Sequence, residues 1–338
     1  MYNKSMWGIT MYTKKAVPFL LLKVLEKYSD DNHQLTQSDI INYMKNDYGL
    51  DVERKSISAN IKLLEELDYD IIKNGKGVSL GDRVFNQNQT RYLIDAVYSS
   101  KNINGSTASD IIKRFASRES IYDKRNYEQI YKTTNEVNRA QSPYIFHVID
   151  VINDAMRQKK RIEFNLITYD DQGRKIFRND GYNYKVSPYY LVNNFGNYYL
   201  LGYYRSKYGP FNVFKLDRMA NVCVSEWDEK PKDEAGLPAN FKISEYLNEH
   251  IYIYGGDTVE AELELKSPDE IINIKDWFNN GAKIETVNGL IHAKVKCNEQ
   301  ALIYWLMQYG KGIKVISPTS LKEKVINLLK EMLNNYEE

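Results

Sequence analysis

The spacing of apolar residues changes along this chain, and that change limits the possible folds more than any other feature. From Val17 to Tyr28, apolar side chains recur at steps of three and four residues, which predicts one buried stripe of an α-helix. From Arg161 to Leu166, polar and apolar residues alternate, which is typical of a half-buried β-strand. A chain of 338 residues is too long for one ordinary core. We therefore expect an α+β multidomain protein.

Residues 1–83 predict three helices followed by a β-hairpin. Thr36-Gln37-Ser38-Asp39 has the capping-box pattern that begins a second helix, and Gly49 ends that helix. A third helix begins near Asp51, which can cap it. Two short β-like runs then flank Asn74-Gly75, the strongest short hairpin signal. Three helices and a basic hairpin, in this order, indicate a winged helix-turn-helix domain.

One face of the third predicted helix carries the residues expected to contact DNA. At 100° per residue, its basic and hydroxyl side chains gather opposite the apolar ones. They lie in the amino-terminal half, through which a recognition helix enters the major groove, whereas Glu65 and Glu66 lie further on. The alternative is a solvated basic face on a small helical domain. With the two lysines of the hairpin, the candidate DNA-binding residues are Arg54, Lys55, Ser56, Ser58, Lys62, Lys73 and Lys76.

Charge and cysteine content exclude several classes of protein. The formal net charge is +1, so nucleic-acid binding must depend on local patches, unlike in a histone-like coating protein. Cys223 and Cys297 are too far apart in sequence to form a disulfide framework or a metal knuckle. The N-terminus lacks a signal-peptide pattern, and the apolar run 16–22 is too short to span a bilayer. We expect a cytoplasmic protein without a metal, a cofactor or a membrane partner.

Residues 84–143 predict a helical connector. The patterns indicate helices at 85–97, at 108–117 with a cap at Thr107 or Ser106, and at about 127–138. They show no catalytic chemistry. We expect this segment to transmit changes between the DNA-binding domain and a sensor, and to be a possible dimer contact.

Residues 144–228 predict one amphipathic helix followed by short antiparallel strands. Strands at this spacing favour a small curled barrel. The chain has 28 tyrosines against 11 phenylalanines, and nine of the tyrosines lie between Tyr182 and Tyr208. Because tyrosine joins a flat apolar ring to a polar tip, it suits binding surfaces as well as cores.

Three motifs in this region resemble the WYL domain family. Pro188 with Tyr190-Leu191 is similar to the family's Pro-x-x-Leu, Tyr198-Tyr199-Leu200 stands where the family has Trp-Tyr-Leu, and residues 214–219 resemble Phe-Arg-Leu-Asp-Arg-Ile. The resemblance covers Val148 to Val224. Residues 1–83 likewise resemble the DNA-binding half of DeoR-like and WYL-type regulators, and residues 93–103 resemble the connector of WYL regulators.

The WYL resemblance implies an Sm-like small β-barrel that binds ligands, nucleotides and nucleic acids among them. Arginine and lysine can hold phosphate, and tyrosine rings can stack on bases. Tyr198 and Tyr199 point to opposite faces of a strand, so Tyr199, which aligns with the family tyrosine, is the better candidate. Alternatives are aromatic barrel core and, for the arginine, an ion pair with Asp217 or Glu163. The candidate ligand-binding residues are Tyr199, Lys215, Arg218, Tyr198 and Arg205.

Residues 229–338 predict a polar linker followed by a C-terminal module. The order strand–helix–strand–strand–helix–strand is that of a ferredoxin-like α/β fold. Residues 308–318 resemble the C-terminal extension that often follows WYL domains. Trp305 and Met307 are expected to be helix core.

These features together predict a regulator rather than an enzyme. His33, His147, His250 and His292 are scattered, and no phosphate loop, metal-ligand spacing or nucleophile motif is evident. The prediction is a homodimer that binds a double-stranded DNA operator and responds to a nucleotide or nucleic-acid ligand at the WYL domain. The alternative is a non-enzymatic accessory protein, for example in phage defence, whose barrel binds RNA or single-stranded DNA.

Overall fold

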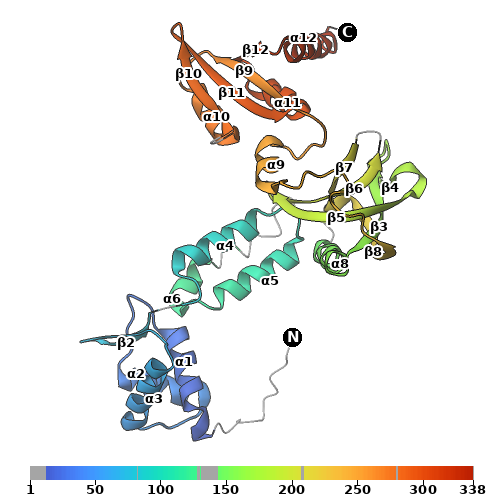
Figure 1. Ribbon diagram of the computed structural model, residues 1–338. Helices are drawn as coiled ribbons and strands as arrows, with labels where there is room; N and C mark the ends of the chain where they lie inside the picture. The colour runs from blue at the N-terminus through green and yellow to red at the C-terminus, as the bar shows by residue number, and fades with distance from the viewer. Residues whose placement is uncertain are drawn as a thin grey trace. The chain divides into compact units, whose positions relative to one another are not determined.

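The computed structural model describes residues 13–81, 83–127, 130, 144–206, 209–278 and 281–337. The chain divides into two compact units, Met1–Pro143 and Tyr144–Glu338 (Figure 1). Each unit has hydrophobic cores of its own.

The first unit begins with three helices and a two-stranded hairpin, in the predicted order. A short 3-10 turn at Lys14–Ala16 precedes them. Buried leucine, isoleucine and valine side chains from all three helices form one core, which also takes in both strands of the hairpin. The elements are α1 (Val17–Tyr28), α2 (Gln37–Tyr48), α3 (Arg54–Glu66), β1 (Ile71–Asn74) and β2 (Gly77–Leu80).

Local sequence chemistry accounts for most of these boundaries. The Thr36 hydroxyl accepts a hydrogen bond from the Asp39 amide, and the Asp39 carboxylate accepts one from the Thr36 amide, so the capping box at α2 is confirmed. Gly49 ends α2 in the left-handed conformation, at φ 65°. The expected cap of α3 at Asp51 is wrong. Glu53 is the N-cap and makes no side-chain capping bond, while the Asp51 carboxylate lies 3.1 Å from Lys45 Nζ.

Buried polar contacts attach the hairpin to the helices. The Ser29 hydroxyl donates to the Leu25 carbonyl oxygen and accepts a hydrogen bond from the Leu80 amide at 3.1 Å. Leu35 forms a bridge with Val78 in β2. The base of the hairpin is therefore fixed to the end of α1 and to the loop before α2.

The connector in the same unit contains α4 (Gln87–Ser99), α5 (Gly105–Ala116), α6 (Ile121–Lys124) and a 3-10 turn (Arg125–Tyr127). Asn104 caps α5 by accepting from the Thr107 amide, so the predicted cap at Thr107 or Ser106 was wrong by two or three residues. Asparagine suits that position because its side-chain oxygen accepts a hydrogen bond from an amide of the first turn that has no partner within the helix. The helix predicted at 127–138 lies almost wholly outside the described residues.

One arginine joins the connector to the first helix. Arg83 Nη2 donates to the Glu26 carbonyl at 3.0 Å and to the Ser29 carbonyl at 2.6 Å, at the carboxy-terminal end of α1. Its Nη1 donates to the Arg118 carbonyl at 2.9 Å, just after α5. Carbonyl groups at a helix end lack partners within the helix, so a cation stabilises them there.

The second unit begins with α8 and a six-stranded antiparallel sheet. The sheet order is β4-β3-β5-β6-β7, and β8 pairs with the other side of β3. A 3-10 turn, η5 (Leu216–Arg218), separates β7 from β8, and in the described residues no pairing joins these two strands. The closed Sm-like barrel expected from the sequence is therefore not found. The elements are α8 (Ile145–Gln158), β3 (Lys160–Tyr169), β4 (Lys175–Phe177), β5 (Asn183–Asn194), β6 (Asn197–Ser206), β7 (Gly209–Lys215) and β8 (Met219–Asp228).

The predicted linker after β8 packs against the sheet. Ala235 and Leu237 are buried against Tyr189, and Lys232 Nζ lies 4.2 Å from the centre of the Tyr190 ring. Helix α9 (Ile243–Glu249) follows, and its apolar residues cover part of β5, β6 and β7. Segment 231–249 therefore belongs to the packed part of this unit.

A four-stranded antiparallel sheet with helices completes the unit. Its order is β10-β11-β9-β12, and its elements follow one another in the predicted order of strand, helix, strand, strand, helix, strand. Trp305 is fully buried in its core, as expected, while Met307 is only partly buried. The elements are β9 (Thr258–Leu265), α10 (Glu270–Phe278), β10 (Lys283–Val287), β11 (Leu290–Asn298), α11 (Glu299–Tyr309), β12 (Ile313–Ser317) and α12 (Thr319–Asn334).

Candidate ligand cavity and DNA-binding face

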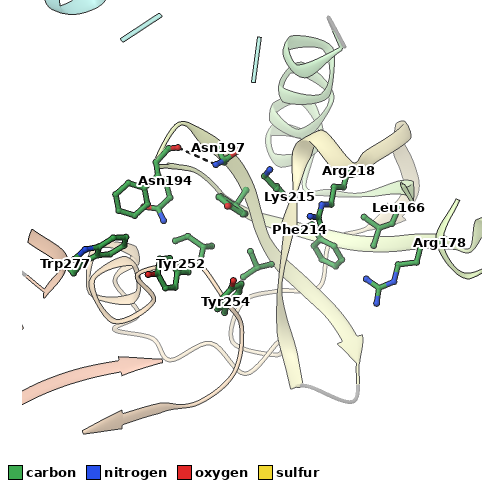
Figure 2. A pocket seen from close by; sticks show the side chains of 14 residues that line it. Leu166, Arg178, Asn194, Asn197, Phe214, Lys215, Arg218, Tyr252, Tyr254 and Trp277 are labelled. Carbon is green, nitrogen blue, oxygen red and sulfur yellow. Dashed lines mark hydrogen bonds between the residues drawn. The ribbon is translucent and has the colours of Figure 1, made fainter. Parts of the chain in front are cut away.

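A cavity of about 620 Å³ lies in the second unit (Figure 2). Residues of the six-stranded sheet and its turns line it, together with residues of the loop after α9 and of α10. Its lining combines three basic side chains with six aromatic rings. Of the five candidate ligand residues, Tyr199, Lys215 and Arg218 line it, whereas Tyr198 and Arg205 do not. The basic residues are Arg178, Lys215 and Arg218, and the aromatic ones are Phe195, Tyr199, Phe214, Tyr252, Tyr254 and Trp277.

The three cations differ in how they are held. Lys215 Nζ lies 2.8 Å from the Asp217 carboxylate. Arg218 has neither of the alternative partners considered from the sequence, because Asp217 pairs with Lys215 and Glu163 pairs with Lys185 at 3.4 Å. Among the described residues, Arg218 has no ion-pair or hydrogen-bond partner, so its guanidinium is available to an anion.

The sequence analysis missed Arg178, which follows β4. Asn179 and Asp180 next to it both have a φ of 51°, in the left-handed region that few residues adopt. The Asn165 side-chain amide donates to the Gly181 carbonyl at 2.7 Å and holds this loop against β3. The run Arg178-Asn179-Asp180-Gly181 is recognisable as a turn, but nothing local indicates that it faces a cavity.

Tyr199 is half-buried between the cations and the aromatic side of the cavity. Burial raises the pKa of its hydroxyl, and the nearby Asp217 and Tyr254 raise it further, whereas Arg218 lowers it. The hydroxyl therefore stays protonated at neutral pH and can donate a hydrogen bond. Tyr198 pairs with Asn193 one position along the strand and projects to the other face.

Four aromatic residues form the side of the cavity opposite the cations: Phe195, Tyr252, Tyr254 and Trp277. The last three lie beyond the predicted sensor at 144–228. Figure 2 shows Trp277, Tyr252 and Tyr254 across from Arg218 and Arg178. Trp277 lies 5.2 Å from both Phe195 and Tyr252 between ring centres. These residues come from α10 and from the loop after α9, which the sequence analysis assigned to linker and module.

The candidate DNA-binding face is exposed on α3 and the hairpin, but its cations are not all free. Lys73 Nζ lies 2.7 Å from Glu65, and Lys62 Nζ lies 3.5 Å from Glu66. Arg54, Lys55 and Lys76 have no ion pair among the described residues. Arg54 donates to the Ser38 hydroxyl at 3.2 Å, Ser58 accepts from Gln37 at 2.7 Å, and Ser56 is partly buried under Asn60.

Comparison with protein families identifies both parts of the second unit. Residues 147–224 match the model of the WYL domain, and residues 257–333 match that of the WCX domain. The chain contains a WYL domain and a WCX domain. The three cations that line the cavity thus belong to the WYL domain, whereas Trp277 belongs to the WCX domain.

Two solved structures resemble parts of the chain. The structure of proteasome accessory factor B/C (PafBC) of Arthrobacter aurescens is 16% identical, with a TM-score of 0.30 over 96% of this chain and 49% of that one. The present chain therefore spans about half of the PafBC chain. The structure of a CRISPR Cas-related protein is 11% identical, with a TM-score of 0.40 over 76% of this chain and 75% of that one. No curated protein matches the sequence.

Two further searches concern membranes and metals. No helix within the described residues is both long and apolar enough to cross a bilayer. Within the same residues, no group of three or more histidine, cysteine, aspartate or glutamate side chains could hold a metal ion.

Proposed function

We propose that this chain is a sequence-specific, DNA-binding transcription regulator that responds to a nucleotide or nucleic-acid fragment bound in the WYL cavity. The observation that carries the proposal is that Tyr199, Lys215 and Arg218, chosen from sequence motifs, converge on one cavity. Two cations with a protonated tyrosine provide what a phosphate group needs, namely charge and hydrogen-bond donors.

The arrangement of the first unit supports the proposed DNA binding. Three helices followed by a hairpin, with free cations at the start of α3, suit a winged helix-turn-helix that places α3 in the major groove. Two copies bound to a pseudo-palindromic operator would place two such helices one helical turn of DNA apart. A ligand that prefers one arrangement of the dimer would then change operator affinity.

We propose a binding role rather than a catalytic one. Three of the four histidines have structural partners: His33 lies 2.7 Å from Asp30, His292 lies 2.9 Å from Glu262, and His250 stacks on Tyr246. None of these three lines the cavity. The proposed site therefore offers charge and stacking, and none of the histidines lines the described part of the cavity.

A mobility-shift titration against the promoter region of the chain's own operon tests the DNA assignment. We expect specific binding to duplex DNA that weakens with salt and falls about tenfold or more for Arg54→Ala, since each lost phosphate contact removes charge attraction. Lys330→Ala, an exposed lysine of α12, is the matched control. Equal affinity for random duplex, with tight binding to single strands instead, would favour the accessory-protein function.

Calorimetric titration of short 5′-phosphorylated single strands and of nucleoside monophosphates tests the ligand. Binding to the wild-type chain that weakens about tenfold on Arg218→Ala would support the cavity assignment. Unchanged binding by the variant would place the ligand elsewhere.

A further inference from the structure

Backbone strain is concentrated at the aromatic side of the cavity. Outside glycine, eight described residues have a positive φ, and five of them are asparagine or aspartate, which tolerate that conformation. Lys159 ends α8 in the way many helices end. The two that remain, Phe195 at 46° and Ile253 at 54°, are bulky residues for which this conformation is costly, and both line the cavity.

Phe195 occupies a position that favours a different residue. With Gly196 it forms the two-residue turn between β5 and β6, and both have positive φ as a type I′ turn requires. Asn-Gly is the preferred pair in such turns. The side chain is also 69% exposed, so burial does not repay the conformational cost. Its ring instead lies at the cavity mouth, 5.2 Å from Trp277.

Ile253 places two tyrosines at the same cavity. Its side chain is buried against Val192 and Leu201, while Tyr252 and Tyr254 on either side line the cavity. The loop is fixed to the WYL sheet because Asn194 Nδ2 donates to the Ile251 carbonyl at 3.1 Å. Tyr254 remains 42% exposed, so a ligand in the cavity can reach its ring.

Trp277 is held in a fixed orientation. Its indole Nε1 donates to the Tyr309 hydroxyl at 3.1 Å, and Tyr309 packs on the buried Trp305. The ring is therefore set by the WCX core and is not free to rotate when a ligand arrives.

We propose that Phe195, Tyr252, Tyr254 and Trp277 form an aromatic clamp that stacks on the base of the ligand and makes the site specific for base-bearing phosphates. Strain of this kind is found at ligand clamps, where it holds side chains in place before binding. Arg178, Lys215 and Arg218 face the clamp and would take the phosphate. The proposal rests on the proposed function, and it adds that the WCX domain and the segment before it choose the ligand.

The clamp also gives the ligand two attachments within the second unit. Its phosphate would bind side chains of the WYL domain, while its base would contact Trp277 of the WCX domain. An occupant therefore stabilises the contact between these parts, because a ligand favours the state that it binds. A phosphate without a base makes only the first attachment.

The test compares two probes on the full chain by calorimetry: 5′-phosphorylated deoxydiadenylate, and the abasic analogue with the same backbone and phosphates. We expect the wild type to prefer the base-bearing probe by about tenfold or more, since stacking on aromatic side chains contributes that much per base. Hydrogen exchange at residues 250–254 should slow with the base-bearing probe and not with the abasic one.

Phe195→Asn is the decisive variant, because it creates the preferred Asn-Gly turn while it removes the ring. We expect an unchanged or higher melting temperature and a base preference reduced to about threefold or less. Tyr254→Ala should reduce the preference in the same direction, and substitution of an 88% exposed tyrosine just after α12, Tyr336→Ala, should not.

The outcomes separate the clamp from the proposed function. Equal binding of both probes by the wild type would overturn the clamp and leave the phosphate site standing. A preference that survives Phe195→Asn and Tyr254→Ala would also overturn it. Binding of neither probe would overturn the proposed ligand class together with the clamp.

Discussion

Within each candidate site, some cationic side chains already have an ion-pair partner and others do not. In the cavity, Lys215 pairs with Asp217, whereas Arg218 has no partner among the described residues. An arginine without a partner can bind a phosphate through two parallel hydrogen bonds. A lysine that is already paired must first weaken its ion pair with the carboxylate before it can bind the phosphate. The unequal contributions of these two cations can be measured.

We expect Arg218→Ala to weaken binding of a 5′-phosphorylated ligand about tenfold, and Lys215→Ala to weaken it less. Hydrogen bonds to charged groups contribute about 1.5–3 kcal/mol, and exposure places this one near the lower end. Calorimetry on both variants decides the order. A larger loss of affinity for Lys215→Ala would show that breaking the ion pair between Lys215 and Asp217 does not weaken phosphate binding.

Asp30 leads to a prediction on pH. Burial raises the pKa of its carboxyl, but hydrogen bonds from Ser120, from His33 and from the Asn32 amide lower it by more, so the pKa lies below its ordinary value. A carboxyl with a lowered pKa stabilises the fold above the unfolded value of about 4 and loses that effect as the pH falls. Asp30→Asn should therefore lower the urea midpoint at pH 7, and the difference from wild type should shrink below pH ~4. A difference that stays constant over that range would contradict the assignment.

At the scale of elements, the hairpin depends on a close backbone approach. Gly77 has a φ of 152°, and a Cβ there would overlap the carbonyl group of Leu35, to which β2 is bridged. Gly75, at the tip, has open space around the corresponding position. The same substitution should therefore be costly at Gly77 and nearly neutral at Gly75.

We expect Gly77→Ala to destabilise the first unit by about 2 kcal/mol and to weaken duplex binding, because the strained backbone must shift. Gly75→Ala should change stability by less than about 0.5 kcal/mol. Chemical denaturation and mobility shift on both variants provide the check, and equal effects would mean that Leu35 does not limit the hairpin.

At the scale of the whole molecule, the proposed DNA binding would have to operate with a formal net charge of only +1. Five candidate cations lie on the DNA-binding face, but Lys62 and Lys73 are paired with glutamates. Arg54, Lys55 and Lys76 remain. Under the proposed function, DNA affinity would depend on few phosphate contacts, and specificity would come from base contacts made by the start of α3.

The salt dependence of operator binding measures how many cations act. Three phosphate contacts per protomer predict a slope of log K against log salt of about −2.7 per protomer, whereas five predict about −4.5. A mobility-shift series at several salt concentrations gives the slope. The steeper value would show that DNA displaces Glu65 and Glu66 from their lysines.

The sequence predicted those features that depend on neighbouring residues. Thr36 and Asp39 begin α2 as a capping box, because caps depend on a few adjacent side chains. The hairpin forms in the predicted segment, but its turn is Gly75-Lys76 rather than Asn74-Gly75, because Asn74 pairs with Gly77 at the end of the ladder. Tyr199 lines the cavity rather than Tyr198 because side chains alternate along a strand.

The features that the sequence did not predict depend on distant contacts. Trp277 reaches the cavity through the packing of α10 beside a turn 82 positions earlier, at Phe195. Lys73 meets Glu65 only because the hairpin folds back toward α3. Periodicity indicates which face of an element is buried, but it does not indicate which two elements meet.

The strained turn at Phe195-Gly196 has an evolutionary consequence. Most substitutions destabilise a fold, so selection for stability removes many of them whether or not they touch a binding site. At residue 195, selection for stability and selection for the proposed binding would oppose each other, since asparagine suits the backbone better than phenylalanine does. If Phe195 stacks on the proposed ligand, a lineage released from selection on that ligand would drift toward asparagine here and would lose its response while remaining well folded.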